Sequence, residues 1–121
     1  MTPNRIHRGD LFWVEAEDAG GLAGGAPHPH LVVQDDLFNH SRIQTVVVCA
    51  LTTNLQRASE PGNVLLDPGE GSLPRQSVVV VSQIASIQKA HLGARIGALS
   101  RSRVEQVLQG LLFQQRSFVT R

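Results

Sequence analysis

The chain has 121 residues, a formal net charge of +1, 41% hydrophobic and 4% aromatic residues, and one cysteine. This length predicts a single domain over residues 1–121 with a modest aliphatic core, and the near-neutral charge excludes a basic surface spread over the whole molecule. The lone cysteine excludes an intramolecular disulfide, and the absence of a long apolar run predicts a cytoplasmic protein without signal peptide or membrane span.

Short strands are predicted over the first two thirds of the chain, where apolar runs rich in β-branched residues alternate with turn signals. A glycine-rich stretch over residues 18–27 favours irregular structure, and we expect residues 20–25 to be the most mobile internal segment. The pattern predicts a mainly β fold, a small β-barrel. The expected strands cover residues 11–14, 31–33, 46–51, 64–66 and 77–81, the last continuing after a bend through 83–88.

The end of the chain is predicted to be helical, because its apolar residues recur at intervals of three and four. Ser102 and Glu105 match a capping box at the start of this helix, and Ser100 is the alternative N-cap. We expect the apolar stripe to pack on the sheet. The residues of the stripe are Val104, Val107, Leu108, Leu111 and Leu112.

Polar side chains gather where the second predicted strand begins and the third ends. Two histidines stand at the start of the second strand, and a Thr-Thr-Asn sequence follows the third. If these strands pair antiparallel, the start of one lies beside the end of the other. The candidate site at this edge contains His28, His30, Thr52, Thr53 and Asn54.

This set of side chains is suited to cutting RNA without a metal ion. The reaction needs a base for the 2′-hydroxyl, an acid for the leaving oxygen and donors for the phosphate. Histidine can transfer protons near neutral pH, and threonine hydroxyls and an arginine can bind phosphate oxygens, so His28 with Thr52, Thr53 and Arg57 meets these needs. The structural alternative is that His28 only ends a strand and Thr52 only satisfies a turn.

Other kinds of site have little support in the sequence. The glycines of residues 20–25 lack the Lys-Ser/Thr of a phosphate-binding loop and the spacing of a dinucleotide site. His28 and His30 share one face of a strand, but two histidines alone make a weak metal site. We therefore expect no metal ion and no cofactor.

Four segments together span most of the chain and share their order and spacing with one protein family. In order, they are RGDLFWVE, PHLVVQDDLFNHS, TVVVCALTTN and LPRQSVVVVSQIASIQKAHLGARIGALS. These segments closely resemble the MazF/PemK toxins of bacterial type II toxin–antitoxin systems. The resemblance implies an SH3-like β-barrel with a C-terminal helix and metal-independent cleavage of single-stranded RNA, usually mRNA.

The resemblance also assigns residues, position by position. Thr52 matches the family's catalytic Thr or Ser, and His28 stands where the family has a catalytic Arg before a Pro. Gln83 belongs to a Q-I pair that the family follows with an Arg, where this chain has Ala85. The expected catalytic residues are therefore His28 and Thr52. The expected RNA-binding residues are His30, Thr53, Asn54, Arg57 and Gln83.

The partners implied by the resemblance are single-stranded RNA, a cognate antitoxin and a second copy of the chain. Contact with DNA is expected only indirectly, through a toxin–antitoxin complex, and no membrane is involved. The alternative function is a catalytically impaired homologue that binds an antitoxin or RNA without cleaving, since His28 replaces an Arg. A DNA-binding regulator is a weaker third reading, because no basic recognition helix is visible.

Overall fold

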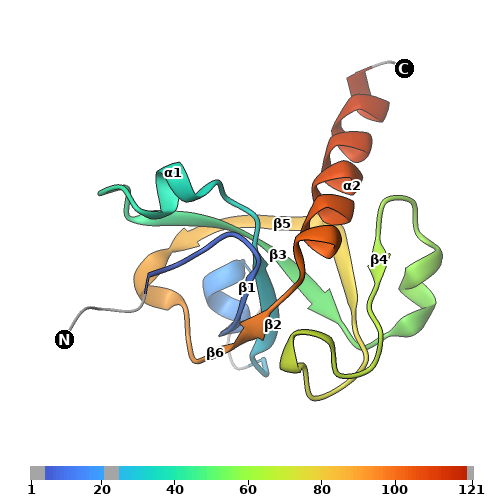
Figure 1. The fold of residues 1–121 in the computed structure, drawn as a ribbon, viewed down its shortest axis with the longest axis horizontal. Coiled ribbons are helices and arrows are strands. Elements are labelled where there is room, and N and C mark those ends of the chain that lie inside the picture. The colour runs from blue at the N-terminus through green and yellow to red at the C-terminus, as the bar shows by residue number, and fades with distance from the viewer. Residues whose placement is uncertain (1–4, 21–24, 120–121) are drawn as a thin grey trace.

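The computed structural model describes residues 5–20 and 25–119, so residues 21–24 of the loop predicted to be mobile lie outside it. Six strands form one antiparallel sheet in the order β4-β5-β3-β2-β1-β6 (Figure 1). The strands are β1 (Asp10–Val14), β2 (His28–Val32), β3 (Thr45–Thr52), β4 (Val64–Leu65), β5 (Val78–Gln88) and β6 (Arg95–Ala98). The helices are α1 (Asp36–Asn39) and α2 (Arg101–Val119), with 3₁₀ turns η1 (Ala16–Ala19), η2 (Leu55–Ser59), η3 (Glu70–Ser72) and η4 (Lys89–His91).

The fold prediction is confirmed: the molecule is mainly β, a curled half-barrel sheet with a C-terminal helix (Figure 1). All five predicted strands are present. The predicted continuation of the last strand is confirmed, because β5 runs from Val78 to Gln88. Its register against β3 shifts between Cys49 and Leu51, which face Ile84 and Val79 of β5, the stretch where the bend was expected. An irregularity of this kind bends a sheet locally and re-aims side chains.

Two elements were not predicted from the sequence. β6 pairs antiparallel with β1, although its residues, Arg-Ile-Gly-Ala, lack a β-branched apolar run. α1 is a single turn in the polar connection between β2 and β3, and the Asp35 carboxylate caps it by accepting from the Leu37 N–H at 2.8 Å. Both elements are short, and their positions depend on tertiary contacts more than on local sequence pattern.

Each face of the sheet carries its own apolar core. The larger core lies under α2 and includes Leu11, Leu31, Cys49, Leu51, Leu66, Val79, Val81, Val107 and Leu111. The smaller core is built on the opposite face and contains Phe12, Val14, Val32, Val46, Val48 and Ile87. These residues alternate along β2 and β3 because successive strand side chains point to opposite faces. The sheet is therefore covered on both sides.

The start of α2 corrects one prediction. The helix begins at Arg101, and the Ser100 hydroxyl accepts from the Arg103 N–H at 3.2 Å. Ser100 is therefore the N-cap, as the alternative predicted, and the capping box of Ser102 and Glu105 is wrong because both residues lie inside the helix. Four residues of the predicted stripe, Val104, Val107, Leu108 and Leu111, do pack on the core, whereas Leu112 is 47% exposed and does not.

The single cysteine is part of the core. Cys49 has no exposed surface, and its thiol donates to the Val80 carbonyl oxygen at 3.0 Å. Desolvation by burial raises the pKa of the thiol to about 12, so it stays protonated and unreactive at neutral pH. Among the helices of the described residues, none has the length and apolar character needed to span a membrane.

Candidate active site

A pocket of 520 Å³ opens at the end of the smaller-core face of the sheet. Five of the seven predicted site residues line it: His28, His30, Thr52, Arg57 and Gln83. Ala16, Ala19 and Gly20 form a wall that comes from η1, and Ala50, Leu51, Ile84 and Ala85 complete the lining from β3 and β5. Thr53 and Asn54 do not line the pocket, although they follow Thr52 directly.

The register of the sheet explains why the two predicted catalytic residues meet. His30 lies opposite Ala50 in the antiparallel pair of β2 and β3. Extending this register by two residues sets His28 opposite Thr52, and residues two apart share a face. Both side chains line the same pocket. His28 is exposed and Thr52 partly buried, so a ligand in the pocket can reach both.

His30 is the buried histidine of the site, with 4% of its surface exposed. Its Nδ1 lies 3.0 Å from the His28 carbonyl oxygen. Since a carbonyl oxygen only accepts, the hydrogen sits on Nδ1 and Nε2 keeps its lone pair. Desolvation by burial lowers the pKa of His30, although the hydrogen bond to His28 opposes this. His30 is therefore a neutral acceptor in the pocket.

The Thr52 hydroxyl is held by the turn that follows β3. Its oxygen accepts from the Asn54 N–H at 3.2 Å, which leaves the hydroxyl hydrogen free to donate to a ligand. The Asn54 side chain is used in the turn itself, where it accepts from the Gln56 N–H at 3.2 Å and caps η2. Asn54 thus supports the position of Thr52 and Arg57 through the backbone.

Arg57 is the cation of the pocket, and it is already paired. Its Nε donates to both carboxylate oxygens of Glu60 at 3.1 Å, and Nη2 lies 3.1 Å from Oε1. The hydrogen bond from Arg57 is the main cause that lowers the pKa of Glu60. Glu60 was missed by the sequence analysis, although its i,i+3 spacing from Arg57 is the signal that indicates it. The Glu60 carboxylate holds the Arg57 guanidinium in place and partly neutralises its positive charge.

A larger hollow of 730 Å³ lies between β4 and α2. It contains no histidine, and its one arginine, Arg103, is engaged by Glu70 through bonds of 2.9 to 3.2 Å. Proton transfer needs a titratable group near neutral pH, which this hollow lacks. We therefore assign the chemistry to the smaller pocket, which joins two histidines, a threonine and an arginine.

Comparison with known proteins identifies the class. Residues 7–114 match the family model described as PemK-like, MazF-like toxin of type II toxin–antitoxin system. Endoribonuclease MazF6 of Mycobacterium tuberculosis is 36% identical over 106 residues, which cover 88% of this chain and 93% of that protein. Endoribonuclease EndoA of Bacillus subtilis is 30% identical over 106 residues, which cover 88% of this chain and 90% of that protein.

Solved structures agree on the fold. A mycobacterial endoribonuclease in complex with its cognate antitoxin superposes with a TM-score of 0.70 at 23% identity, covering 88% of this chain and 90% of that one. MazF of Deinococcus radiodurans gives a TM-score of 0.71 at 18% identity, covering 90% and 94%. At these identities the likeness establishes the fold alone.

The chain belongs to the family of PemK-like, MazF-like toxins of type II toxin–antitoxin systems. Its similar curated relatives are endoribonucleases by name. The predicted family, fold class and general function, an endoribonuclease toxin, are thereby confirmed. The roles of His28, Thr52 and the RNA-binding residues stay predictions.

Proposed function

We propose that this chain cleaves single-stranded RNA in the pocket lined by β2, β3 and β5, without a metal ion, with His28 and Thr52 as the catalytic residues. One observation carries the proposal: an exposed histidine and a threonine hydroxyl line one pocket together with an arginine and a glutamine. This combination supplies proton transfer and phosphate binding from side chains alone.

His28 takes the proton of the 2′-hydroxyl as that oxygen forms a bond to phosphorus. The bond from phosphorus to the 5′-oxygen breaks, and the protonated imidazole returns its proton to the leaving oxygen. The products are a 2′,3′-cyclic phosphate and a free 5′-hydroxyl, so atoms and charge balance. Thr52 donates its hydroxyl hydrogen to a phosphate oxygen, whose charge grows in the transition state.

The remaining residues bind the RNA strand. Arg57 attracts a phosphate, with its charge moderated by Glu60. Gln83 and His30 offer hydrogen bonds from the pocket wall, and Nε2 of His30 acts as an acceptor. Thr53 and Asn54 contribute beyond the edge of the pocket. An open pocket at the ends of β2 and β3 suits a single strand, whose bases are not stacked in a duplex.

The partners follow from the family. We propose that a cognate antitoxin inhibits this toxin, because relatives of the same fold are solved with theirs. We further propose that the chain works in the cytoplasm as a homodimer and reaches DNA only indirectly, through the toxin–antitoxin complex.

The direct test is cleavage of a long single-stranded RNA by purified, antitoxin-free protein, with and without EDTA. Wild-type protein should cut the RNA at the same rate in both conditions. Thr52→Ala should lower the single-turnover rate about 10²-fold, the typical cost of removing one donor to a developing oxyanion.

Thr53→Ala is the matched control, because it removes the same hydroxyl one residue further along, outside the pocket lining. The fall in cleavage rate caused by Thr53→Ala should be at least about tenfold smaller than the fall caused by Thr52→Ala. Equal effects of the two substitutions contradict the proposed role of Thr52. Loss of activity in EDTA contradicts metal independence.

A further inference from the structure

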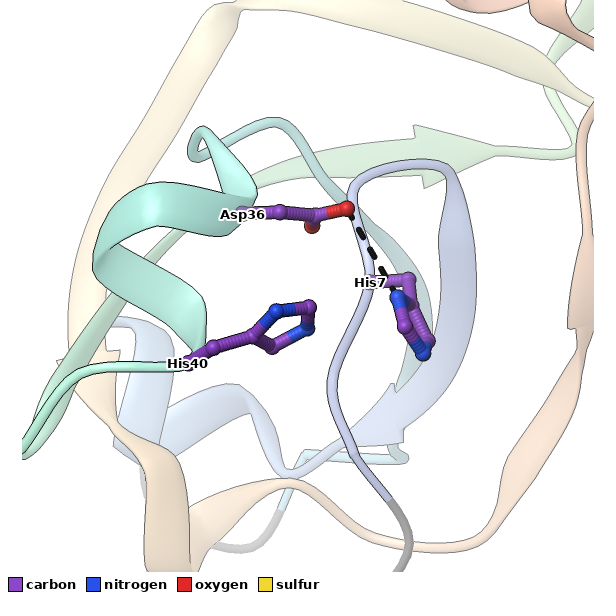
Figure 2. Close-up of side chains that lie close together, drawn as sticks. All are labelled: His7, Asp36 and His40. Carbon is purple, nitrogen blue, oxygen red and sulfur yellow. Dashed lines mark ion pairs between the residues drawn. The ribbon is translucent and has the colours of Figure 1, made fainter.

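Three side chains with metal-binding atoms converge at the opposite end of β2 from the pocket. His7, Asp36 and His40 bring one ligand atom each within 4.8 Å of one another. The His7 Nδ1 lies 3.6 Å from the Asp36 Oδ2, and the two imidazole rings meet edge to face with centroids 4.8 Å apart (Figure 2). We call these three residues the α1 triad.

Two of the three triad residues form a local pattern in the sequence. Asp36 is the first residue of α1 and His40 its C-cap, a spacing of four that sets both on one side of a helical turn. His7 comes from the segment before β1. Its N–H donates to the Asp10 Oδ2 at 2.9 Å, which fixes the backbone there. The triad thus joins the N-terminal segment to α1.

Hydrogen bonds to neighbouring groups fix two of the ligand side chains. The His40 Nε2 lies 2.9 Å from the Ile6 carbonyl oxygen, so Nε2 carries the hydrogen and Nδ1 keeps a lone pair. Metal-bound histidines are normally oriented by such a bond from the other ring nitrogen. Asp36 is anchored through Oδ1, which accepts from the Arg8 N–H at 2.6 Å and the Asn39 amide at 3.0 Å. Its Oδ2 faces His7.

We propose that the α1 triad binds one divalent transition metal ion of the zinc type, with water completing the coordination. Two imidazoles and a carboxylate are the donor set that Zn²⁺ accepts, whereas Mg²⁺ and Ca²⁺ prefer oxygen ligands alone. Zinc bonds of roughly 2.0–2.2 Å set ligand atoms about 3.4 Å apart. The His7 and Asp36 side chains are 51% and 43% exposed, so they have room to close from their present spacing.

The bound ion has a structural role in this proposal. It ties the segment before β1 to α1, which lies at the end of β2 away from His28. It takes no part in cleavage, so this inference stands or falls separately from the proposed function. A metal that binds only the folded chain stabilises it, and a hundredfold excess of free ion over Kd lowers the unfolded fraction about a hundredfold.

The test uses the full chain without a polyhistidine tag, stripped of metal with EDTA and exchanged into metal-free buffer. Titration with Zn²⁺ against a chromophoric chelator should give one ion per chain. Thermal unfolding should move up by several degrees with Zn²⁺. Co²⁺ should bind at the same site and show the visible absorption of a four-coordinate complex. Failure of wild-type protein to bind Zn²⁺ or to gain stability overturns the proposal.

His7→Gln and His40→Gln test the ligands, and His91→Gln is the matched control. His91 also stands beside a carboxylate, with its Nδ1 3.5 Å from the Asp18 Oδ1, but it belongs to no cluster of three ligands among the described residues. The two triad variants should each lose at least about tenfold in Zn²⁺ affinity, and the control should lose none. Equal affinity in all variants overturns the assignment. Unfolding in EDTA checks that each variant folds.

Discussion

At the scale of single residues, the chemistry of the pocket depends on which polar groups already have hydrogen-bond or ion-pair partners. Arg57 is bound to Glu60, and Thr52 accepts a backbone hydrogen bond yet keeps its own hydrogen to donate. His30 is held neutral by burial, while His28 is exposed at the pocket. The groups that can respond to a substrate are therefore His28, Thr52 and, after competition with Glu60, Arg57.

This competition predicts a gain of RNA binding from one substitution. Glu60→Gln removes the carboxylate that shares the charge of Arg57, so a phosphate should bind the guanidinium more tightly. Affinity for an uncleavable 2′-O-methyl strand should rise severalfold at low salt. The slope of the logarithm of the RNA-binding constant against the logarithm of salt concentration should steepen by roughly 0.7. This is the change expected for one further phosphate contact on a single strand.

Glu105→Gln is the control, since it removes the same charge from an exposed position on α2. It should change affinity little, because that position is outside the pocket lining. Equal gains in affinity from the two substitutions would reflect net charge alone and would contradict a competition between Glu60 and phosphate for Arg57.

At the scale of elements, the contact between α2 and the turn before β4 depends on two glycines. Gly62 has a φ of +85°, and its carbonyl oxygen approaches the backbone of Gly110 in the middle of α2. A Cβ built at Gly110 would clash with that oxygen and would also lie 3.1 Å from a Val81 methyl. Because the obstacle is backbone, it has little freedom to move aside.

Gly110→Ala should therefore destabilise the protein by about 1–3 kcal/mol, the usual cost of overpacking. The same change in an open helix interior stabilises by roughly 0.5–1 kcal/mol, so the predicted sign is reversed. Urea unfolding measures this difference, with Gln109→Ala, an exposed neighbour on the same helix, as the control. A stability equal to or above wild type contradicts the proposed close contact.

The elements also show where sequence reasoning reaches its limit. Long apolar runs predicted β3 and β5, and a regular helical stripe predicted α2, because burial of a whole face leaves a periodic signal. β6 was missed since its four residues lack that signal. Antiparallel pairing of β2 with β3 places His28 and Thr52 in the lining of one pocket, as predicted. The Arg57–Glu60 pair has a local spacing that was overlooked, whereas the α1 triad needs His7, which is distant in sequence.

At the scale of the whole molecule, we expect a homodimer. The single long helix covers one face of the sheet, yet large apolar side chains stay exposed on and beside it. Leu65 is 43% exposed, Leu112 47% and Phe113 55%. Leu65 and Phe113 both line the hollow between β4 and α2, so they lie on one side of the molecule. Exposed large apolar side chains gathered on one side of a molecule are typical of protein–protein contact sites.

Sedimentation equilibrium at concentrations on the order of tens of micromolar should give twice the mass of one chain, 13.1 kDa. Association should persist at high salt, because apolar burial is not screened as ion pairs are. A chain that sediments as a monomer over this range counts against the dimer.

The central claim is that His28 transfers the proton in RNA cleavage, and single-turnover rates of histidine variants test it most directly. His28→Ala should slow cleavage by about 10²–10⁴-fold without unfolding the exposed strand end, and His40→Ala, away from the pocket, should not. His28→Arg supplies a permanent positive charge but cannot accept a proton, so it should be as slow as His28→Ala. Wild-type rates for His28→Ala, or cleavage by His28→Arg alone while the wild-type chain is inactive, would contradict the account.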